Sequence, residues 1–417
     1  MDSIVVTGGN KLSGKIAASG SKNAALPILF STLLADGVHR FDNVPELRDI
    51  DSAEALLKAL NCEVERDASS LQLLVKQPDK PEAPYDLVRK MRASILCLGP
   101  LLARYGEARV SLPGGCAIGS RPVDLHVETM RRLGAEVDIE EGYVVARAGR
   151  LRGDRILFEK VTVGGTENAL MAATLAKGTT VIENAAKEPE VVDLAKYLRT
   201  MGANIEGEGT SIITIDGVDE LAPGQHTIVA DRIEAGTLLI AGAITGGNVT
   251  VDQCVPKHLQ SLIDKLHECG FAIHTDESSV SVDATDEWTS ADISTTPYPG
   301  FPTDLQAQFM ALMTQANGTS VITEGIFENR FMHVQELVRL GADISPIAQV
   351  AVVRGDRGGL SGAQVMATDL RASASLVLAG LVAKGTTQVN RIYHLDRGYE
   401  HLEQKLASLG ANISRGA

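Results

Sequence analysis

The segment LAKGTTVIENAAKEPEVVDLAKYLRTMGANIE, residues 175–206, decides the fold because the chain repeats it. It reads as a helix ending at Gly178, a short strand, a polar loop, an amphipathic helix stopping at Gly202, and an apolar strand. Three clear copies lie at 34–65, 315–345 and 382–414, and two more divergent copies at 103–138 and 244–274. Such self-similarity is typical of a fold built from packed repeats.

The second helix of each copy stops at Gly or Asn. These stops recur at intervals of about seventy residues, at Asn61, Gly134, Gly202, Gly270, Gly341 and Gly410. Glycine enters the left-handed region freely and asparagine is the next best residue, so both are preferred just after a helix. A regular series of such stops predicts six equivalent units.

Each unit also has an upstream helix that is apolar nearly all round. The six segments are 21–37, 86–106, 165–178, 231–247, 303–318 and 369–385. Helices of this kind are buried inside a domain, whereas the amphipathic second helices should face solvent on one side. The short strands would then form sheets wrapped around the buried helices.

The length of 417 residues favours two domains, because three units of about seventy residues each are enough to form the hydrophobic core of one domain. We predict one domain over 22–229 and a second over 1–21 plus 230–417. The first strand, within residues 2–19, has no partner in the first unit. We expect it to pair with the last unit and to close the second domain across the chain ends.

Composition excludes several classes of protein. The formal net charge is −14, which disfavours a global binder of nucleic acid or of an anionic membrane. The cysteines are odd in number and scattered, without a CxxC pair, which argues against a disulfide framework or zinc cluster and for a reducing compartment. The N-terminus lacks a basic region, and the longest apolar run, 24–34, is too short to span a bilayer. We therefore expect a cytoplasmic protein.

Charged and polar residues stand at the starts of the buried helices, among them Lys22, Asn23, Arg92, Asp304, Asp369 and Arg371. Asp304 and Asp369 have a simple interpretation as helix caps or first-turn residues. A cation opposes the dipole of a helix start, so Lys22, Arg92 and Arg371 need an anionic partner, either in the protein or in a ligand. If these starts line a cleft between the two domains, the cleft suits a substrate that carries phosphates and carboxylates.

The divergent second copy carries the stretch SLPGGCAIGSRPVDLH, residues 111–126, with a lone thiol at Cys116. Its neighbours are Gly, Pro and Ala, so packing as a small hydrophobe is a poor explanation for this cysteine. The glycines predict a loop that moves, and we expect a lid that closes when substrate binds.

Seven stretches together carry a family resemblance: GSKNAALP (20–27), RKMRASI (89–95), PGGCAIGSRPVDLH (113–126), GFPTDLQAQ (300–308), ENRFMHVQEL (328–337), ATDLRASASLVLAG (367–380) and HLDRGYE (394–400). In this order they resemble the family of UDP-N-acetylglucosamine 1-carboxyvinyltransferases, which are enolpyruvyl transferases. The resemblance implies a two-domain inside-out α/β barrel of the EPSP synthase type, with three repeats of a βαβαββ unit per domain.

The resemblance also implies a reaction. The enolpyruvyl group of phosphoenolpyruvate passes to the 3′-hydroxyl of UDP-N-acetylglucosamine by addition and elimination, and phosphate is released, as the first committed step of peptidoglycan precursor synthesis. No metal or organic cofactor is implied. Cys116 corresponds to the general acid, to the residue that holds a covalent adduct, and to the target of the epoxide fosfomycin.

Further site residues follow from the same resemblance. Asp304 would take the proton of the sugar hydroxyl, and Lys22, Arg121 and Arg397 would hold the phosphate and carboxylate of the donor. Lys22 and Arg397 would also be catalytic residues, together with Cys116 and Asp304, and Asn23 would bridge the two substrates. The sugar nucleotide would be held by Asn23, Arg92, Arg121, Pro122, Val123, Asp124, Leu125, Lys160, Val161, Thr162, Val163, Asp304 and Ile326. Arg330, Asp369 and Arg371 would support the site, with structural ion pairing among these three as the alternative.

Two other functions stay open from the residues. One is the sister enzyme that transfers enolpyruvyl to shikimate 3-phosphate, which is not expected to carry the GGCAIG loop at 114–119. The other is a non-enzymatic binder of sugar nucleotides, which would need Arg92 and Arg121 but has no need of both Cys116 and Asp304. The joint presence of this thiol and this carboxylate favours an enzyme.

Overall fold

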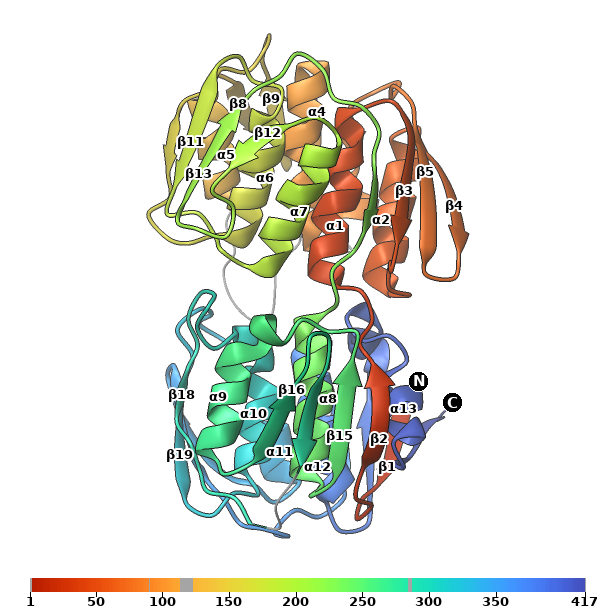
Figure 1. Cartoon of the computed structure of the whole chain (residues 1–417), viewed down its shortest axis with the longest axis vertical. Coiled ribbons are helices and arrows are strands. Elements are labelled where there is room, and N and C mark those ends of the chain that lie inside the picture. The colour runs from red at the N-terminus through yellow and green to blue at the C-terminus, as the bar shows by residue number, and fades with distance from the viewer. Residues whose placement is uncertain (1, 90, 113–122, 284–286, 417) are drawn as a thin grey trace. The chain divides into compact units, whose positions relative to one another are not determined.

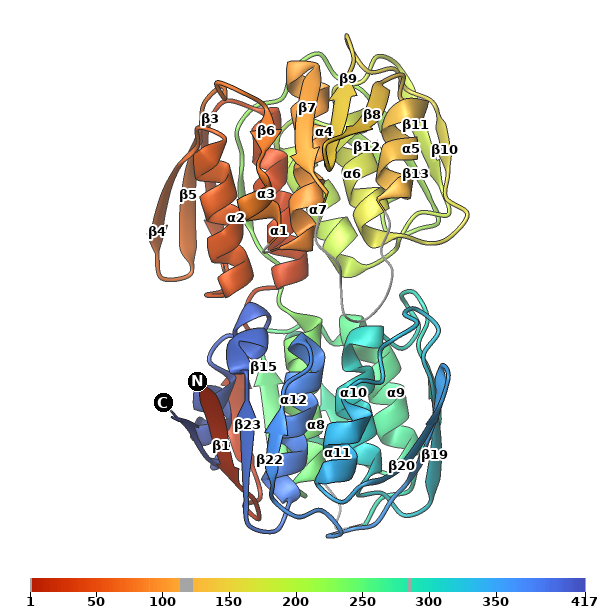
Figure 2. The ribbon, with the colours of Figure 1, turned by 180° about the vertical axis from the view of Figure 1, so that it is seen from behind.

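The computed structural model of the chain describes residues 2–89, 91–112, 123–283 and 287–416. These residues fall into two units, each with a hydrophobic core of its own. Unit A holds residues 20–112 and 123–229, and unit B holds residues 2–19, 230–283 and 287–416. In each unit the sheets lie outside a group of helices, which confirms the inside-out α/β fold (Figures 1 and 2).

The apolar segments form the central helices, as predicted. In unit A these are α1 (Lys22–Ser31), α4 (Leu98–Tyr105) and α6 (Val163–Ala173), and in unit B they are α8 (Arg232–Ile244), α10 (Gln306–Met313) and α12 (Leu370–Val382). Most of their side chains are buried. Helices without a polar face would expose apolar side chains to water on every side, so they are buried in the core.

The amphipathic helices are α2 (Arg48–Ala59), α5 (Asp124–Arg132), α7 (Pro189–Thr200), α9 (Gln260–Glu268), α11 (Val334–Arg339) and α13 (Leu402–Ser408). All six predicted stops have a positive φ, between 66° at Asn61 and 106° at Gly202. At Gly134 the N–H donates to the carbonyl of Arg131 at 2.9 Å, and the N–H of Ala135 donates to Met130 at 3.0 Å. The other five stops make the same two bonds, which satisfy carbonyls at the helix end. The six stops are confirmed.

One predicted helix is broken. The segment 86–106 forms α3 (Tyr85–Val88), the 3-10 segment η2 (Arg92–Cys97) and α4 instead of one continuous helix. The cause is Met91, whose backbone is extended at φ −147° and ψ 116°. The remaining 3-10 segments are η1 (Thr32–Leu34), η3 (Pro256–Leu259), η4 (Thr303–Leu305) and η5 (Ile392–Arg397).

The described strands form six sheets of four strands each. In unit A the sheet orders are β14-β3-β5-β4, β6-β7-β9-β8 and β10-β11-β13-β12. These strands are β3 (Gly37–Asp42), β4 (Glu63–Asp67), β5 (Ser70–Val75), β6 (Glu82–Ala83), β7 (Glu107–Ser111), β8 (Glu136–Glu140), β9 (Tyr143–Arg147), β10 (Arg155–Leu157), β11 (Thr179–Glu183), β12 (Asn204–Glu206), β13 (Ile212–Asp216) and β14 (Gln225–Thr227). The first strand of each order pairs in parallel and the other pairings are antiparallel.

Unit B repeats this pattern with the orders β2-β15-β17-β16, β18-β19-β21-β20 and β22-β23-β1-β24. Its strands are β1 (Ser3–Thr7), β2 (Ser13–Ala17), β15 (Asn248–Asp252), β16 (Ala272–Thr275), β17 (Val280–Asp283), β18 (Ile293–Ser294), β19 (Thr319–Thr323), β20 (Asp343–Ile347), β21 (Val350–Arg354), β22 (Gln364–Met366), β23 (Thr386–Asn390) and β24 (Asn412–Gly416).

The N-terminal segment forms two strands rather than the single strand predicted. Strand β1 pairs with β23 and β24 of the last repeat, which confirms the expected link between the chain ends. The chain then turns at Gly8 and Gly9, where Gly9 has φ 109°, and β2 pairs in parallel with β15 in another sheet. A β-carbon on Gly8 would lie 2.2 Å from the carbonyl oxygen of Ala383, so this turn requires glycine.

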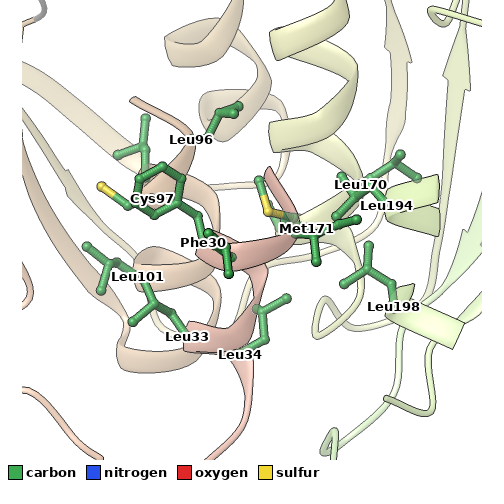
Figure 3. Packing of buried hydrophobic residues seen from close by; sticks show 14 of the residues in the cluster. Phe30, Leu33, Leu34, Leu96, Cys97, Leu101, Leu170, Met171, Leu194 and Leu198 are labelled. Atoms are coloured by element: carbon green, nitrogen blue, oxygen red, sulfur yellow. The ribbon is translucent and has the colours of Figure 1, made fainter. Parts of the chain in front are cut away.

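The core of unit A shows why one repeat cannot bury its apolar helix by itself. Phe30 of α1, Leu101 of α4 and Met171 of α6 come from three different repeats and pack in one buried cluster, together with Leu194 of α7 (Figure 3). Each of these side chains is fully buried. Neighbouring repeats therefore cover one another's apolar helices. Within the described residues, no helix has both the length and the apolar character needed to cross a membrane.

Candidate active site

Three predicted site residues, Cys116, Arg121 and Pro122, lie outside the described residues, as does the predicted lid at 113–122. The others are divided between the two units. Unit A carries Lys22, Asn23, Arg92, Val123, Asp124, Leu125, Lys160, Val161, Thr162 and Val163, and unit B carries Asp304, Ile326, Arg330, Asp369, Arg371 and Arg397.

Asp304 of η4 is held by two arginines from different repeats. One carboxylate oxygen accepts a bond from Arg330 Nη2 at 2.9 Å, and the other accepts one from Arg371 Nη2 at 2.9 Å. The arginine side chains are only 6% and 4% exposed, whereas Asp304 is 26% exposed. The acid thus keeps access to solvent, while the two cations that hold it are fixed in the protein.

The charge state of Asp304 follows from this geometry. Burial alone would raise its pKa, but the charges of Arg371 and Arg330 and their hydrogen bonds outweigh burial and hold the pKa well below its usual range. Asp304 is therefore ionised at neutral pH and can accept a proton or a hydrogen bond. Asp304 lies in the first turn of η4, as the simple interpretation allowed, but it does not cap this segment, because the cap position is Pro302 and both carboxylate oxygens bind arginine.

A second, buried carboxylate supports this group. Glu324, which is 1% exposed, accepts bonds from the hydroxyl of Thr303 at 3.0 and 2.9 Å, and that hydroxyl accepts a bond from Arg330 Nη1 at 3.1 Å. Glu324 also accepts the N–H of Ile326 at 2.9 Å. One carboxylate thus positions both the arginine beside Asp304 and the predicted sugar-binding residue Ile326. Nothing in the sequence distinguishes Glu324 from a surface glutamate, so sequence reasoning missed it.

Arg371, in the first turn of α12, has its own support. Its guanidinium lies over the ring of Tyr399, 5.2 Å from the centroid. The Tyr399 hydroxyl accepts a bond from Gln308 Nε2 at 2.8 Å, and Gln308 also donates to the backbone carbonyl of Asp304 at 2.9 Å. These two residues lie within the motifs HLDRGYE and GFPTDLQAQ, so the motifs located them although no role was predicted.

Asp369 behaves as the simple interpretation predicted. Its side chain caps α12 by accepting the backbone N–H groups of Arg371 at 2.8 Å and Ala372 at 3.0 Å. The expected structural ion pairing is present for Arg330 and Arg371, but their shared partner is Asp304. Asp369 therefore does not contact Asp304 directly but helps to position Arg371 by capping the start of α12.

In unit A, Lys22 has an anionic partner in the protein. Its Nζ lies 3.3 Å from Asp49 Oδ2, and the two side chains are 12% and 5% exposed. Asn23 follows it in the first turn of α1 and is half-buried. Arg92 is half-buried at the start of η2, and in unit B Arg397 is half-buried at the end of η5.

The predicted sugar-nucleotide residues of unit A gather at the starts of two helices. Asp124 and Leu125 form the first turn of α5, directly after Val123 at its cap position. Thr162 caps α6 by accepting the N–H of Gly165 at 3.1 Å, and Val163 is the first helical residue. Lys160 is exposed and Val161 is half-buried just before this helix. Free N–H groups at a helix start favour an anion such as a phosphate.

The four cysteines within the described residues are all buried. Burial raises the pKa of the thiols of Cys62, Cys97 and Cys269 to about 12 and also raises that of Cys254. A nucleophilic cysteine needs an accessible thiolate, so none of these four suits covalent chemistry.

Comparison with known proteins identifies the family to which the chain is similar. A sequence model of the family described as EPSP synthase (3-phosphoshikimate 1-carboxyvinyltransferase) matches residues 6–406. The chain is 65% identical to the UDP-N-acetylglucosamine 1-carboxyvinyltransferase of Bdellovibrio bacteriovorus over 412 residues, which is 99% of this chain and 100% of the relative. It is 58% identical to the protein of the same name from Myxococcus xanthus over 418 residues, covering 100% of this chain and 99% of the relative.

Solved structures agree on the fold. The enolpyruvyl transferase NikO from Streptomyces tendae has a TM-score of 0.89 at 26% identity, over 99% of this chain and 98% of that protein. An EPSP synthase from Acinetobacter baumannii has a TM-score of 0.76 at 16% identity over 100% of both chains, and at that identity the likeness concerns the fold alone.

Proposed function

The chain belongs to the family of UDP-N-acetylglucosamine 1-carboxyvinyltransferases, and from this premise we propose that it transfers the enolpyruvyl group of phosphoenolpyruvate to the 3′-hydroxyl of UDP-N-acetylglucosamine. The observation that carries the proposal is the identity of 65% to a relative of that name over the full length of both chains. The ionised Asp304 between two buried arginines supports it with a group suited to proton transfer.

The reaction balances without an external oxidant or reductant. In the addition, the sugar oxygen bonds to C2 of phosphoenolpyruvate, its proton leaves, and the methylene carbon C3 gains a proton. In the elimination, the bond between C2 and the phosphate oxygen breaks, C3 loses a proton, and the double bond forms again. The products are the enolpyruvyl ether of the sugar nucleotide and inorganic phosphate.

Asp304 is our candidate for the residue that receives the proton of the sugar hydroxyl. Because Arg371 and Arg330 hold its pKa low, it is a weak base toward a free hydroxyl. The hydroxyl becomes far more acidic as its oxygen bonds to C2, so proton transfer to Asp304 accompanies that bond. Arg330, Asp369 and Arg371 then have the supporting role of fixing this carboxylate and the start of α12.

Cys116 is our candidate for the general acid that protonates C3 and for the thiol that forms a covalent adduct. Both roles come from the family resemblance; they are supported by the other four cysteines, which are buried and whose thiol pKa values are raised, so none of them is a rival candidate. Fosfomycin would react at the same sulfur, which opens the epoxide by forming a C–S bond while a C–O bond breaks.

The donor and acceptor would be held by separate sets of residues. We assign the phosphate and carboxylate of phosphoenolpyruvate to Lys22, Arg121 and Arg397, and a bridging contact to Asn23. Arginine suits this role because its fork binds two oxygens at once. We assign the sugar nucleotide to Arg92, to the segments 121–125 and 160–163, and to Ile326. The helix starts at Asp124 and Val163 support this assignment, because the start of a helix favours a negative charge such as a phosphate.

The proposal extends to the setting of the reaction. We propose that units A and B are the two domains predicted at 22–229 and at 1–21 plus 230–417, that the enzyme is cytoplasmic, and that its product is the first committed intermediate of peptidoglycan precursor synthesis.

One assay tests the proposed reaction. Purified protein is mixed with phosphoenolpyruvate and either UDP-N-acetylglucosamine or shikimate 3-phosphate, and phosphate release is followed. We expect release with the sugar nucleotide only. Release with shikimate 3-phosphate alone would assign the chain to the sister reaction, and binding of the sugar nucleotide without turnover would indicate a sensor.

Mass spectrometry tests the thiol. We expect fosfomycin to add one molecule to the wild-type chain and none to Cys116→Ser, which should also lose activity. Cys97→Ser is the matched control, because that thiol is fully buried in unit A, and it should label as the wild type does. Undiminished labelling of Cys116→Ser would move the reactive thiol to another cysteine.

A further inference from the structure

A buried amide joins the segments of unit A that carry the predicted acceptor-binding residues. Asn168 of α6 is fully buried. Its Oδ1 accepts the N–H of Gly99 at 2.8 Å, while its Nδ2 lies 3.1 Å from the carbonyl of Ile95 and 3.0 Å from His126 Nδ1. A neutral amide satisfies these three partners without placing a charge in the core.

Two of the three partners of Asn168 lie in elements that carry residues assigned to the sugar nucleotide. Ile95 lies in η2, which begins with Arg92, and His126 lies in α5, directly after Asp124 and Leu125. Asn168 itself lies in α6, whose first turn follows Thr162. Through Ile95, His126 and Gly99, one side chain therefore links α6 to η2, α5 and α4 of the preceding repeat.

His126 is in the right protonation state for this contact. Burial, and then the charge of Arg92, lower its pKa to about 4, so the ring is neutral at pH 7. A neutral ring can accept the amide N–H at Nδ1 while Nε2 keeps its proton. A protonated ring would offer a second donor to the amide nitrogen, and the contact would be lost.

Two glycines allow the elements to approach this closely. A β-carbon on Gly99 would lie 2.4 Å from Asn168 Oδ1, so any side chain there would displace the amide. A β-carbon on Gly164, in the first turn of α6, would lie 3.3 Å from His126 Cε1. The ring of His126 therefore packs directly against the start of α6.

We propose that Asn168 is a positioning residue for the sugar-nucleotide acceptor. It holds η2, α5 and the start of α6 at the spacing that the nucleotide and its diphosphate require. The proposal rests on the proposed function and deepens it, because it separates acceptor binding from donor binding. Asn168 acts through its neighbours, so its loss should weaken the acceptor more than the donor.

The first test is Asn168→Ala, with steady-state kinetics for both substrates and calorimetric titration of UDP-N-acetylglucosamine. We expect KM for this acceptor to rise about tenfold while KM for phosphoenolpyruvate changes less than about twofold. The matched control is Met171→Ala, which opens a cavity on the same buried helix without touching these hydrogen bonds. It should lower the melting temperature and leave both KM values near those of the wild type.

The second test is Asn168→Asp, which keeps the shape of the side chain but removes both N–H donors. At pH 8 the carboxylate repels the carbonyl oxygen of Ile95, and it can bond to neutral His126 only if the ring moves its proton from Nε2 to Nδ1. As the pH falls the carboxylate favours protonation of His126, whose Nδ1–H can then donate to it. We expect the ratio of variant to wild-type Kd for UDP-N-acetylglucosamine to fall from pH 8 to pH 6. A merely structural role does not predict this recovery of affinity.

The outcomes separate the two proposals. A wild-type chain that neither binds nor turns over UDP-N-acetylglucosamine overturns the proposed function and the acceptor role together. If the wild type is active, equal changes of both KM values in Asn168→Ala, or a Kd ratio for Asn168→Asp that does not change with pH, overturn the positioning role alone.

Discussion

Units A and B have the same scaffold but differ in the polar chemistry that joins their repeats. In unit A the amide of Asn168 links neighbouring repeats through neutral hydrogen bonds. Unit B has a neutral link of this kind as well, from Gln308 to Tyr399, but adds ion pairs between repeats in which at least one side chain is deeply buried: Asp304 with Arg330 and Arg371, and Glu234 with Lys405 at 2.8 Å. Sheet order and helix stops are shared by both units. The apolar pattern and the glycine positions therefore determine the scaffold that the two units share, while the polar residues at the helix starts differ between the units.

The ionic cluster of unit B should give the largest effect. We expect Asp304→Asn to lower kcat by about a thousandfold, because the amide keeps the shape but cannot accept a proton. Steady-state phosphate release at saturating substrates measures this. The control is Asp343→Asn, which removes an exposed ion pair with Arg354 and should change neither kcat nor stability. A kcat for Asp304→Asn within tenfold of the wild type would contradict a role in proton transfer.

A buried histidine of unit A predicts a pH effect on stability. His39 is fully buried, with its Nδ1 2.5 Å from the Tyr197 hydroxyl and its Nε2 3.0 Å from the carbonyl of Ala35. Burial lowers its pKa from 6.5 to about 4. As pH falls below 6.5 the unfolded chain therefore takes up the proton first, and folded stability declines until about pH 4.

Chemical denaturation at pH 7 and pH 5 measures this decline. Between these values His39 should account for about 2 kcal/mol of lost stability, so His39→Gln should flatten the slope by that amount. His274→Gln, at a side chain 69% exposed, is the control and should keep the wild-type slope. An unchanged slope for His39→Gln would mean that His39 stays accessible to protons in the folded state.

The sequence was sufficient where structure depends on local pattern. The six stops and the buried helices follow from periodicity and from the residues that favour a positive φ, and the pairing of the first strand with the last repeat was inferred because that strand has no partner in the first unit. The break at Met91 and the second strand at Ser13–Ala17 were missed, because long-range packing and sheet pairing decide them.

Partner choice at the candidate site was less predictable. Charge alone required an anion near Lys22 and Arg371, but many carboxylates were available, and only folding selects Asp49 and Asp304. Asp304 and Asp369 looked alike as acids at helix starts, yet one binds two arginines and the other caps a helix. Glu324 acts through Thr303 and Arg330, and a role of this kind leaves no local pattern.

The shared scaffold predicts equal effects in the two units. Gly134 in unit A has φ 90° and Gly270 in unit B has φ 98°, and a β-carbon at either position would meet no atom within 4 Å. Replacement by Ala therefore tests backbone strain alone, and each variant should lose about 1 kcal/mol of stability. Asn61→Gly is the reverse control: it relieves the positive φ but loses the bond from Asn61 Nδ2 to the carbonyl of Gln77 at 2.8 Å, so its stability should stay close to that of the wild type. Clearly unequal losses at Gly134 and Gly270 would show that the two stops are not equivalent.

The smallest effect should come from the second aspartate of unit B. Asp369→Ala removes the cap of α12 and should cost about 1 kcal/mol, whereas Asp369→Ser keeps an oxygen that can accept the same N–H groups and should cost only a few tenths. Denaturation of the two variants measures this difference. Because Asp369 accepts from the backbone N–H of Arg371, Asp369→Ser should also keep the guanidinium in place and retain most of kcat. A large loss of kcat in Asp369→Ser at unchanged stability would mean that its carboxylate charge serves the reaction directly, and the contrast between a capping Asp369 and a reacting Asp304 would fail.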